Sequence, residues 1–457
     1  MRLDRSKPSC ERYVTHRAFG GGEKLMAIAE SSMAAASPTK ITARDWKTIV
    51  LASIGNGIEY YDFIVFATFA SYIATQIFPS TSQAISLLNT FAVFAVGYLI
   101  RPIGGMILGS FGDRIGRRRV FVFSLLAISL ATLGMSITPT YEKIGILAPI
   151  IFVILRLCQG LCYGGEQAGS LTYVIEVAPR RAGFACGFVF FLNVAGVVTA
   201  NVISGIIHAK MAPADVADYG WRIAFMFGAG LGLLGMLFRR GLEESPEFVR
   251  MQSHVLRAPL SELFKSYKGQ LVVGTLIVAP LAILGGLLFA HMPAYLIRLV
   301  GISPSAIPSI IASGSIVIAA SSVFYGWLSD IIGQRALYRL GALSIIAGAW
   351  PVYHLLSTKT GDAWTIIVIS GVFTALITGS VGPLIAQLFP TQVRFTGYGF
   401  CYNVGNALFQ GLSPLLATYL IQATGALTAP AYVWIGASVI ALFASVGHSR
   451  LARKTTA

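Results

Sequence analysis

Five ionisable residues lie inside long apolar stretches in the first half of the sequence, where charge is unusual. They are Glu59, Asp62, Arg101, Arg156 and Glu166. If these stretches cross a bilayer, each charge costs roughly 2.5–3.5 kcal/mol at its centre, so it is rarely kept without a function. The apolar stretches of the second half hold no acidic residue away from their ends. Ionic chemistry is therefore expected in the first half.

The three acidic residues of this set are candidates for binding a transported proton. Glu59 and Asp62 are three residues apart, so they share one face of a helix. Two neighbouring carboxylates repel each other when both are ionised, which favours a proton on one of them. We predict a proton-coupling site made of Glu59, Asp62 and Glu166. A purely structural network of buried ion pairs with the arginines is the alternative.

The residues predicted to bind substrate are polar side chains within apolar stretches of both halves. A guanidinium matches a carboxylate in shape, and Gln159 and Tyr173 belong to one polar stripe with a repeat of seven residues. Neutral amides can bind carboxylates or hydroxyls, although they can also link neighbouring helices. The predicted substrate site comprises Arg101, Arg156, Gln159, Tyr173, Asn403, Asn406 and Gln410.

Charged residues also gather where two apolar stretches end. A carboxylate near the N-terminus of a neighbouring helix is stabilised by about 0.3–1 kcal/mol. Together with arginines in the same loop, such a carboxylate could hold one side of the molecule shut. The predicted gating residues are Asp113, Arg114, Arg118, Asp330 and Arg335.

Twelve apolar segments would have to position these side chains. Hydrophobic residues form 55% of the chain and charged residues 12%, about half the charged fraction of a soluble domain. Segments of about 20 apolar residues span a bilayer as helices, because every backbone polar group must be paired in lipid. The fold class is therefore an all-α membrane protein with helices near 48–78, 84–110, 119–138, 147–178, 184–208, 221–239, 271–297, 307–329, 336–356, 363–389, 397–423 and 429–448.

Lys and Arg residues lie mainly in alternate loops, which predicts the orientation. With a cytoplasmic N-terminus, the opposite-side loops hold only Lys143, Lys210, Arg222, Arg298 and Lys359. This asymmetry predicts that both termini are cytoplasmic. It also explains the net charge of +15 without a nucleic-acid partner.

The two halves carry matching loops. Gly109, Asp113, Gly116 and Arg118 recur as Gly326, Asp330, Gly333 and Arg335, all offset by 217 residues. Two pseudo-symmetric six-helix bundles are typical of transporters with internal repeats. We predict an extension at 1–47, bundles at 48–239 and 271–449, a cytoplasmic linker at 240–270 and a tail at 450–457.

Motifs for other functions are missing from the sequence. There is no Gly-x-x-x-x-Gly-Lys-Ser/Thr phosphate loop, so ATP-driven transport by this chain is not expected. No Ser/His/Asp set or metal-ligand spacing stands out, and the five cysteines form no metal or disulfide framework. We expect neither enzyme activity, nor a cofactor, nor a metal.

Several motifs resemble a known family. The segment from Gly109 to Arg118, Gly-Ser-Phe-Gly-Asp-Arg-Ile-Gly-Arg-Arg, is similar to the loop signature of the major facilitator superfamily. Other motifs resemble its metabolite:proton symporter branch. These are Gly-Asn-Gly-Ile-Glu-Tyr-Tyr-Asp-Phe at 55–63, Arg-Pro-Ile-Gly-Gly at 101–105, Arg-Leu-Cys-Gln-Gly-Leu-Cys-Tyr-Gly-Gly-Glu at 156–166, Glu-Ser-Pro-Glu-Phe at 244–248 and Pro-Leu-Ser-Glu-Leu-Phe at 259–264.

The resemblance implies a monomeric proton-coupled importer in a bacterial inner membrane. Members carry 2-oxoglutarate, citrate, shikimate, dicarboxylates, or proline and betaines. We therefore predict symport of a proton with a small organic anion by alternating access. A zwitterion symporter and a membrane sensor with a transporter fold are the alternatives. The expected partners are the substrate, the proton and the lipid bilayer.

The fifth segment departs from the family pattern. Members resembling this chain carry Gly-Phe-Tyr-x-Ser-x-Gln at its start, whereas residues 183–189 read Gly-Phe-Ala-Cys-Gly-Phe-Val. A polar wall is thus expected to be apolar here. The tail also lacks the heptad pattern of the osmosensory betaine and proline members.

The first 25 residues are expected to lie upstream of the native start, since they are charged, aperiodic and unlike the family's leader. Met26 opens a more ordinary start, with Met33 as a second candidate, and the codons of Gly21 to Glu23 can spell a ribosome-binding sequence. A real but disordered extension is the alternative. The intact mass of protein made from the native gene should lack residues 1–25, and deleting them should leave transport unchanged. A mass that includes Met1 would refute this prediction.

Overall fold

The computed structural model describes residues 41–80, 82–252, 255–303 and 306–456. The expectations for residues 1–25 therefore lie outside the described residues. Contacts divide the chain into Met1–Thr42 and Ala43–Ala457, and all helices discussed below belong to the second unit.

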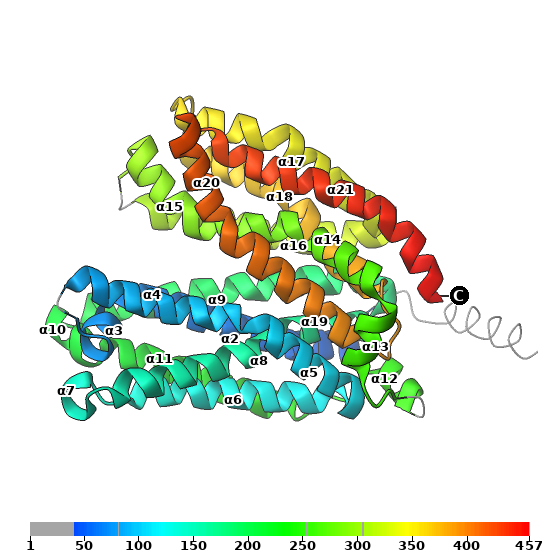
Figure 1. The fold of residues 1–457 in the computed structure, drawn as a ribbon, viewed down its shortest axis with the longest axis horizontal. Coiled ribbons are helices and arrows are strands. Elements are labelled where there is room, and N and C mark those ends of the chain that lie inside the picture. Colours follow the sequence, from blue (N-terminus) through cyan, green and yellow to red (C-terminus); the bar gives the residue numbers. More distant parts are fainter. Residues whose placement is uncertain (1–40, 81, 253–254, 304–305, 457) are drawn as a thin grey trace, which may run out of the picture. The chain divides into compact units, whose positions relative to one another are not determined.

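Twelve helices in the described residues are long and apolar enough to cross a membrane, which confirms the predicted number. Figure 1 shows their arrangement in the second unit. They are Ala43–Thr68, Ala95–Ile115, Arg117–Ile137, Leu147–Val177, Pro179–Lys210, Pro213–Arg239, Lys268–Tyr295, Ile307–Ile332, Gln334–Ser357, Ala363–Ala386, Arg394–Thr424 and Ala429–Ala452.

The helices of the first half build six spans, and short helices follow them. They are α2 (Ala43–Thr68), α3 (Ala70–Ile77), α4 (Gln83–Leu99), α5 (Arg101–Ile115), α6 (Arg117–Ile137), α7 (Tyr141–Ile144), α8 (Leu147–Val177), η1 (Pro179–Arg181), α9 (Ala182–Lys210), α10 (Pro213–Asp215), η2 (Val216–Gly220) and α11 (Trp221–Arg239). The segment predicted as a linker holds α12 (Pro246–Met251) and α13 (Pro259–Ser266).

The second half repeats the plan. Its elements are α14 (Lys268–Gly285), η4 (Gly286–His291), α15 (Met292–Tyr295), η5 (Leu296–Val300), α16 (Ile307–Ile332), α17 (Gln334–Ser357), α18 (Ala363–Ala386), α19 (Arg394–Gly405), η7 (Asn406–Gln410), α20 (Gly411–Thr424) and α21 (Ala429–Thr456). The last helix continues past residue 450, where the sequence suggested a tail.

Several spans are interrupted, and two of the interruptions, in the seventh and eleventh spans, contribute residues to the site. The second span is divided into α4 and α5 at Ile100, because Pro102 cannot donate a hydrogen bond to the helix. The seventh and eleventh spans contain the π-helical segments η4 and η7. Such segments are frequent at functional sites, since the extra residue redirects side chains.

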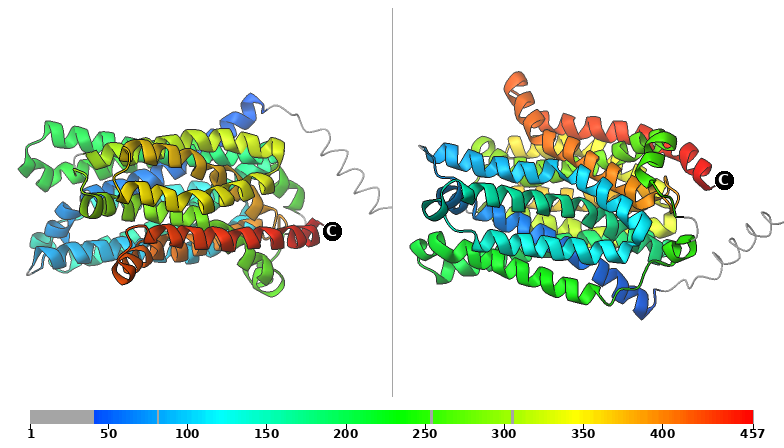
Figure 2. Two further views of the ribbon diagram at one scale, coloured as in Figure 1. Left: turned by 90° about the horizontal axis from the view of Figure 1, so that it is seen from above. Right: turned by 60° about the horizontal axis from the view of Figure 1, so that its bottom comes forward.

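Each half of the chain packs mainly with itself. Figure 1 shows the blue-to-green helices on one side and the green-to-red helices on the other, and Figure 2 shows the same helices from two further directions. Between the groups, α5 packs against α19 and α9 packs against α16. These two contacts are pseudo-symmetric, because α5 and α16 carry the repeated Gly-x-x-x-Asp of the two halves.

Glycines allow the close approach at both crossings. A Cβ atom at Gly326 on α16 would collide with the Gly183 carbonyl on α9, and one at Gly399 on α19 would come close to the Gly105 carbonyl on α5. Small residues that let helix backbones meet are typical of membrane bundles.

We expect Gly326→Leu to reduce stability, because the side chain has no room between α16 and α9. Overpacking of this kind costs about 1–3 kcal/mol. Thermal unfolding of the purified protein measures the effect. Gly348→Leu on α17 is the matched control, since no atom lies within 4 Å of a Cβ there. Equal melting temperatures for the two variants would contradict the prediction.

Candidate functional site

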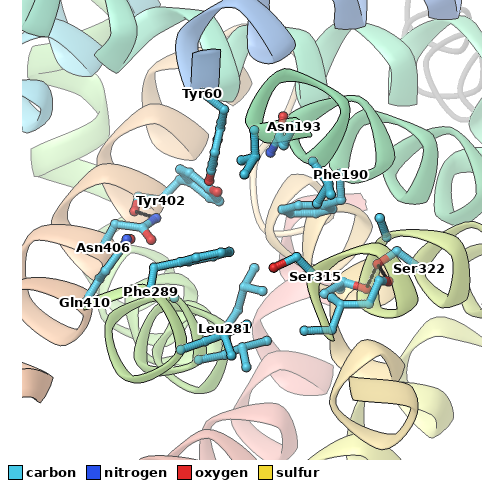
Figure 3. Close-up of a pocket in the computed structure, with 18 residues that line it drawn as sticks. Tyr60, Phe190, Asn193, Leu281, Phe289, Ser315, Ser322, Tyr402, Asn406 and Gln410 are labelled. Carbon is cyan, nitrogen blue, oxygen red and sulfur yellow. Dashed lines mark hydrogen bonds between the residues drawn. The ribbon is translucent and has the colours of Figure 1, made fainter. Parts of the chain in front are cut away.

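A cavity lies between the two groups of helices (Figure 3). About 690 Å³ of empty space lies within its bounds, open solvent included. The first half supplies α2 and α9, and the second half supplies α14, η4, α16, α18, α19 and η7. The lining residues are Tyr60, Phe190, Asn193, Val194, Val197, Leu281, Leu284, Gly285, Leu288, Phe289, Ser315, Ile318, Ala319, Ser322, Thr378, Tyr402, Asn406 and Gln410.

The wall of this cavity is mostly apolar with a few polar side chains, and none of the described residues that line it is acidic or basic. Three amides, Asn193, Asn406 and Gln410, face it from both halves, and two of them were predicted from the sequence. Aromatic rings come from both halves as well, including Tyr60 and Tyr402. The wall can therefore form hydrogen bonds and aromatic contacts.

The predicted substrate residue Arg101 lies behind this wall, paired with Glu59. Its Nη1 donates to Glu59 Oε1 over 2.6 Å, with 13% of the Arg101 side chain and 1% of Glu59 exposed. The guanidinium carbon lies 4.1 Å from the centre of the Tyr98 ring, and Tyr98 interacts in turn with Gln410 of the wall. Arg101 is thus separated from the cavity by one layer of side chains.

Asp62 lies in a buried hydrogen-bond cluster formed by α2, α6 and α8. Its Oδ2 accepts from Thr132 Oγ1 and from the Tyr163 hydroxyl, both at 2.7 Å, and from Gln159 Nε2 at 3.2 Å. Arg156 Nη1 donates to Gln159 Oε1 over 2.8 Å. A continuous path of hydrogen bonds therefore joins Arg156 to Asp62 through Gln159.

Asp62 differs from the other two predicted proton-coupling residues in its neutralisation. In the described part of the chain it forms no salt bridge, and its Oδ1 has no hydrogen-bond partner although the residue is only 2% exposed. An unpaired buried carboxylate is strongly disfavoured in its charged form. Among the described residues, Glu59 and Glu166 each have an arginine partner, and Asp62 is the carboxylate of this set without an ion pair.

Glu166 is neutralised by Arg239, the last residue of α11. Arg239 Nη2 lies 2.6 Å from Glu166 Oε1, and both side chains are fully buried. Ser124 donates to the second carboxylate oxygen at 3.0 Å, and Arg239 also donates to the carbonyls of Leu51 and Ala52 on α2. This pair joins α2, α6, α8 and α11 away from the Asp62 cluster.

Two predicted substrate residues contact protein backbone instead of the cavity. The Tyr173 hydroxyl donates to the carbonyl of Glu243. Asn403 Nδ2 donates to the carbonyls of Gly164, at 2.7 Å, and Gly399, at 2.8 Å. Asn403 therefore links α19 to α8, the helix-linking alternative considered for these amides.

The two predicted gating aspartates each cap a helix of the opposite half. Asp113 accepts from the backbone N–H groups of Phe395 and Thr396, at 3.3 and 2.9 Å. Asp330 accepts from those of Gly183 and Phe184, at 2.8 and 2.9 Å. We call the end of the molecule that carries Asp113 and Asp330 the latch end. Both halves are in contact there.

Buried ion pairs surround Asp113 at the latch end. Arg117 bridges Asp113 at 3.2 Å and Glu176 at 3.1 Å, and Arg394 from the second half also pairs with Glu176 and with Glu247. The arginine buried in this network is thus Arg117, whose side chain was not among the predicted gating residues.

The three predicted gating arginines lie outside these ion pairs. Arg114 and Arg118 are exposed, and Arg118 donates to the carbonyl of Arg240. Arg335 is partly buried and has no ion pair among the residues that the structure describes.

Some site residues were missed in the sequence. Tyr60 stands between Glu59 and Asp62, and Asn193 and Tyr402 lie within apolar segments. A polar residue inside a membrane span is itself a signal, so Asn193 could have been selected in that way. Arg239 could not have been selected from the sequence, because its pairing with Glu166 depends on how α11 packs among the other helices.

The chain matches known sequences over most of its length. The profile of the Major Facilitator Superfamily covers residues 52–408. A citrate-proton symporter of Klebsiella pneumoniae is 30% identical over 87% of this chain and 90% of the relative. A proline/betaine transporter of Escherichia coli K12 is 29% identical over 89% of this chain and 84% of the relative.

Solved structures show the same fold. The proton:xylose symporter XylE bound to 6-bromo-6-deoxy-D-glucose has a TM-score of 0.72 at 16% identity, covering 90% of this chain and 97% of that one. The human organic anion transporter MFSD10 has a TM-score of 0.65 at 14% identity, covering 88% of this chain and 99% of that one. The chain belongs to the Major Facilitator Superfamily, and its relatives are those of the metabolite:proton symporter branch.

Proposed function

We propose that this protein couples the entry of a proton to the uptake of a small organic solute that carries one carboxylate. The observation behind the proposal is Asp62, a buried carboxylate without an ion-pair partner, joined to Arg156 through Gln159. A proton on Asp62 removes the unpaired negative charge. Its loss restores that charge in the interior of the first half, where Asp62 contacts α6 and α8.

The charge balance of the first half supports a substrate with a single carboxylate. Three carboxylates, Glu59, Asp62 and Glu166, share this interior with three guanidiniums, Arg101, Arg156 and Arg239. When Asp62 is protonated, these three guanidiniums outnumber the two remaining ionised carboxylates of the set by one. A substrate carboxylate balances it, so proton and substrate favour each other's binding.

The same balance argues against substrates with several negative charges. Each further carboxylate would be buried without a counter-charge, and a buried unpaired charge is highly unfavourable. A citrate-proton symporter is among the relatives, but none of the described residues that line the cavity of this chain is positively charged.

A zwitterion is the second candidate, and the aromatic wall favours it. Tyr60, Phe190, Phe289 and Tyr402 all line the cavity, and aromatic faces attract cationic ammonium groups. Such a substrate also carries a single carboxylate. Several relatives are described as proline/betaine transporters.

Transport would proceed by exchanging access to the cavity between two bundles, 48–239 and 271–449. Release of the contacts of Asp113 and Asp330 with the opposite half would open the latch end. The concentration of Arg and Lys in the loops at this end supports a cytoplasmic location, and hence import across a bacterial inner membrane.

Uptake is expected to depend on the proton gradient. In membrane vesicles energised with an inward proton gradient, a protonophore should abolish accumulation of substrate while leaving equilibration intact. Uptake measured with a panel of labelled mono-, di- and tricarboxylates and zwitterions identifies the chemical class of the substrate. Accumulation that persists with the protonophore and depends on sodium would contradict proton coupling.

Asp62→Asn should abolish gradient-driven accumulation, because an amide has the same volume but does not titrate. Exchange of internal for external substrate needs no net proton movement, so it should continue. Uptake under a proton gradient and counterflow, measured in the same proteoliposomes, separate the two activities. A variant that accumulates substrate like the wild type would place the proton site elsewhere.

Glu166→Gln is the matched control, since it makes the same chemical change in a paired carboxylate. It leaves Arg239 buried without a counter-charge, which destabilises a protein by about 3–5 kcal/mol. We therefore expect Glu166→Gln to lower the melting temperature more than Asp62→Asn does. The opposite order would contradict the assigned pairing.

A further inference from the structure

Asn193 on α9 is a buried amide whose hydrogen-bonding atoms are unused. The residue is 3% exposed, and neither Oδ1 nor Nδ2 has a hydrogen-bond partner among the described residues. The Tyr60 hydroxyl is close enough to interact with it, but no hydrogen bond of normal geometry joins them. Buried amides are nearly always paired, so this exception requires an explanation.

The side chain of Asn193 faces the central cavity. Figure 3 shows it beside Tyr60 and Phe190, opposite the amides of the second half. Its helix is held firmly against α2, because a Cβ atom at Gly57 or Gly196 would collide with backbone of the facing helix. Asn193 is therefore a fixed polar group on the wall.

Asn193 also supplies what the start of α9 lacks. Ala185, Gly187 and Val189 stand where the family pattern has polar residues, and Ala185 and Val189 are fully buried. Asn193 lies one turn beyond Val189, on the same face of the helix. The polar contribution of this helix to the cavity is thus displaced by one turn.

The amides on the opposite wall are arranged differently. Asn406 Nδ2 donates to the carbonyl of Tyr402 over 2.8 Å, which leaves its Oδ1 to accept a hydrogen bond. Asn193, in contrast, presents both a donor and an acceptor. A ligand that satisfies Asn193 must therefore offer an acceptor and a donor close together.

We propose that Asn193 selects substrates that carry a hydroxyl or N–H group next to the carboxylate. Nδ2 donates to a carboxylate oxygen, and Oδ1 accepts from the adjacent O–H or N–H. A fully methylated ammonium has no such hydrogen, and it leaves Oδ1 buried and unpaired. The inference rests on the proposed function and narrows it to hydroxy- and amino-carboxylates.

The proposal predicts a measurable preference within matched pairs of compounds. A site built to pair with an O–H or N–H disfavours an analogue that lacks it, here by about tenfold or more. The pairs are proline against N,N-dimethylproline, and 2-hydroxybutanoate against butanoate. Apparent KM values for all four labelled compounds are measured in proteoliposomes with an inward proton gradient.

In the variant Asn193→Leu, the two members of a transported pair should have nearly equal apparent KM values. Leucine has a similar volume to asparagine but lacks both of its polar side-chain atoms. Asn201→Leu is the matched control. Asn201 lies on the same helix but is exposed, does not line the cavity, and donates to the carbonyl of Val197. This control should keep the wild-type ratio.

The possible failures can be told apart. If none of the four compounds, nor any other carboxylate, shows proton-driven uptake, the proposed function itself is wrong. If uptake occurs but the wild type accepts both members of each pair equally, or Asn193→Leu keeps the preference, the role of Asn193 is overturned. If Asn193→Leu fails to reach the membrane, the ratio of apparent KM values in the wild type still tests the proposal. A ratio close to one in the transported pair would overturn it.

Discussion

The interior of a membrane protein has little tolerance for unbalanced charge, and this constraint organises the first half of the chain. Glu59 is neutralised by Arg101 and Glu166 by Arg239, each at 2.6 Å. Asp62 receives hydrogen bonds from neutral side chains, one of which, Gln159, also bonds to Arg156. Because the other two carboxylates each have an arginine partner, the proposed function assigns the transported proton to Asp62.

The same constraint explains how the two halves can be joined and separated. Asp113 and Asp330 are balanced by backbone N–H groups at the start of a helix in the opposite half, where the helix dipole favours a carboxylate. Glycine pairs at the crossings bring the helices close enough for these contacts. If the latch end opened, water could replace the backbone N–H groups as hydrogen-bond donors to these carboxylates. The two halves could then separate without another protein group to pair with the aspartates.

The sequence was sufficient for the fold and for part of the site. Apolar length predicted twelve spans, and the repeated Asp113 and Asp330 were correctly expected near helix N-termini. Asn406 and Gln410 were selected because they share a helical face, and both line the cavity. Asn403 shares that face too, yet it donates to backbone carbonyls instead of lining the cavity. Spacing along one helix does not show how closely a neighbouring helix packs against each residue. The ion pairs of Arg239 and Arg117 depend on contacts between helices far apart in the sequence. The sequence positions of the two arginines do not reveal these contacts.

The central claim is that substrate and proton bind together through Asp62. Proton uptake by the purified protein in weakly buffered detergent solution, recorded with a pH indicator as substrate is added, tests it most directly. The account predicts that the wild type takes up protons on binding substrate near neutral pH and that Asp62→Asn binds substrate without taking up protons. Equal proton uptake by both proteins would contradict it.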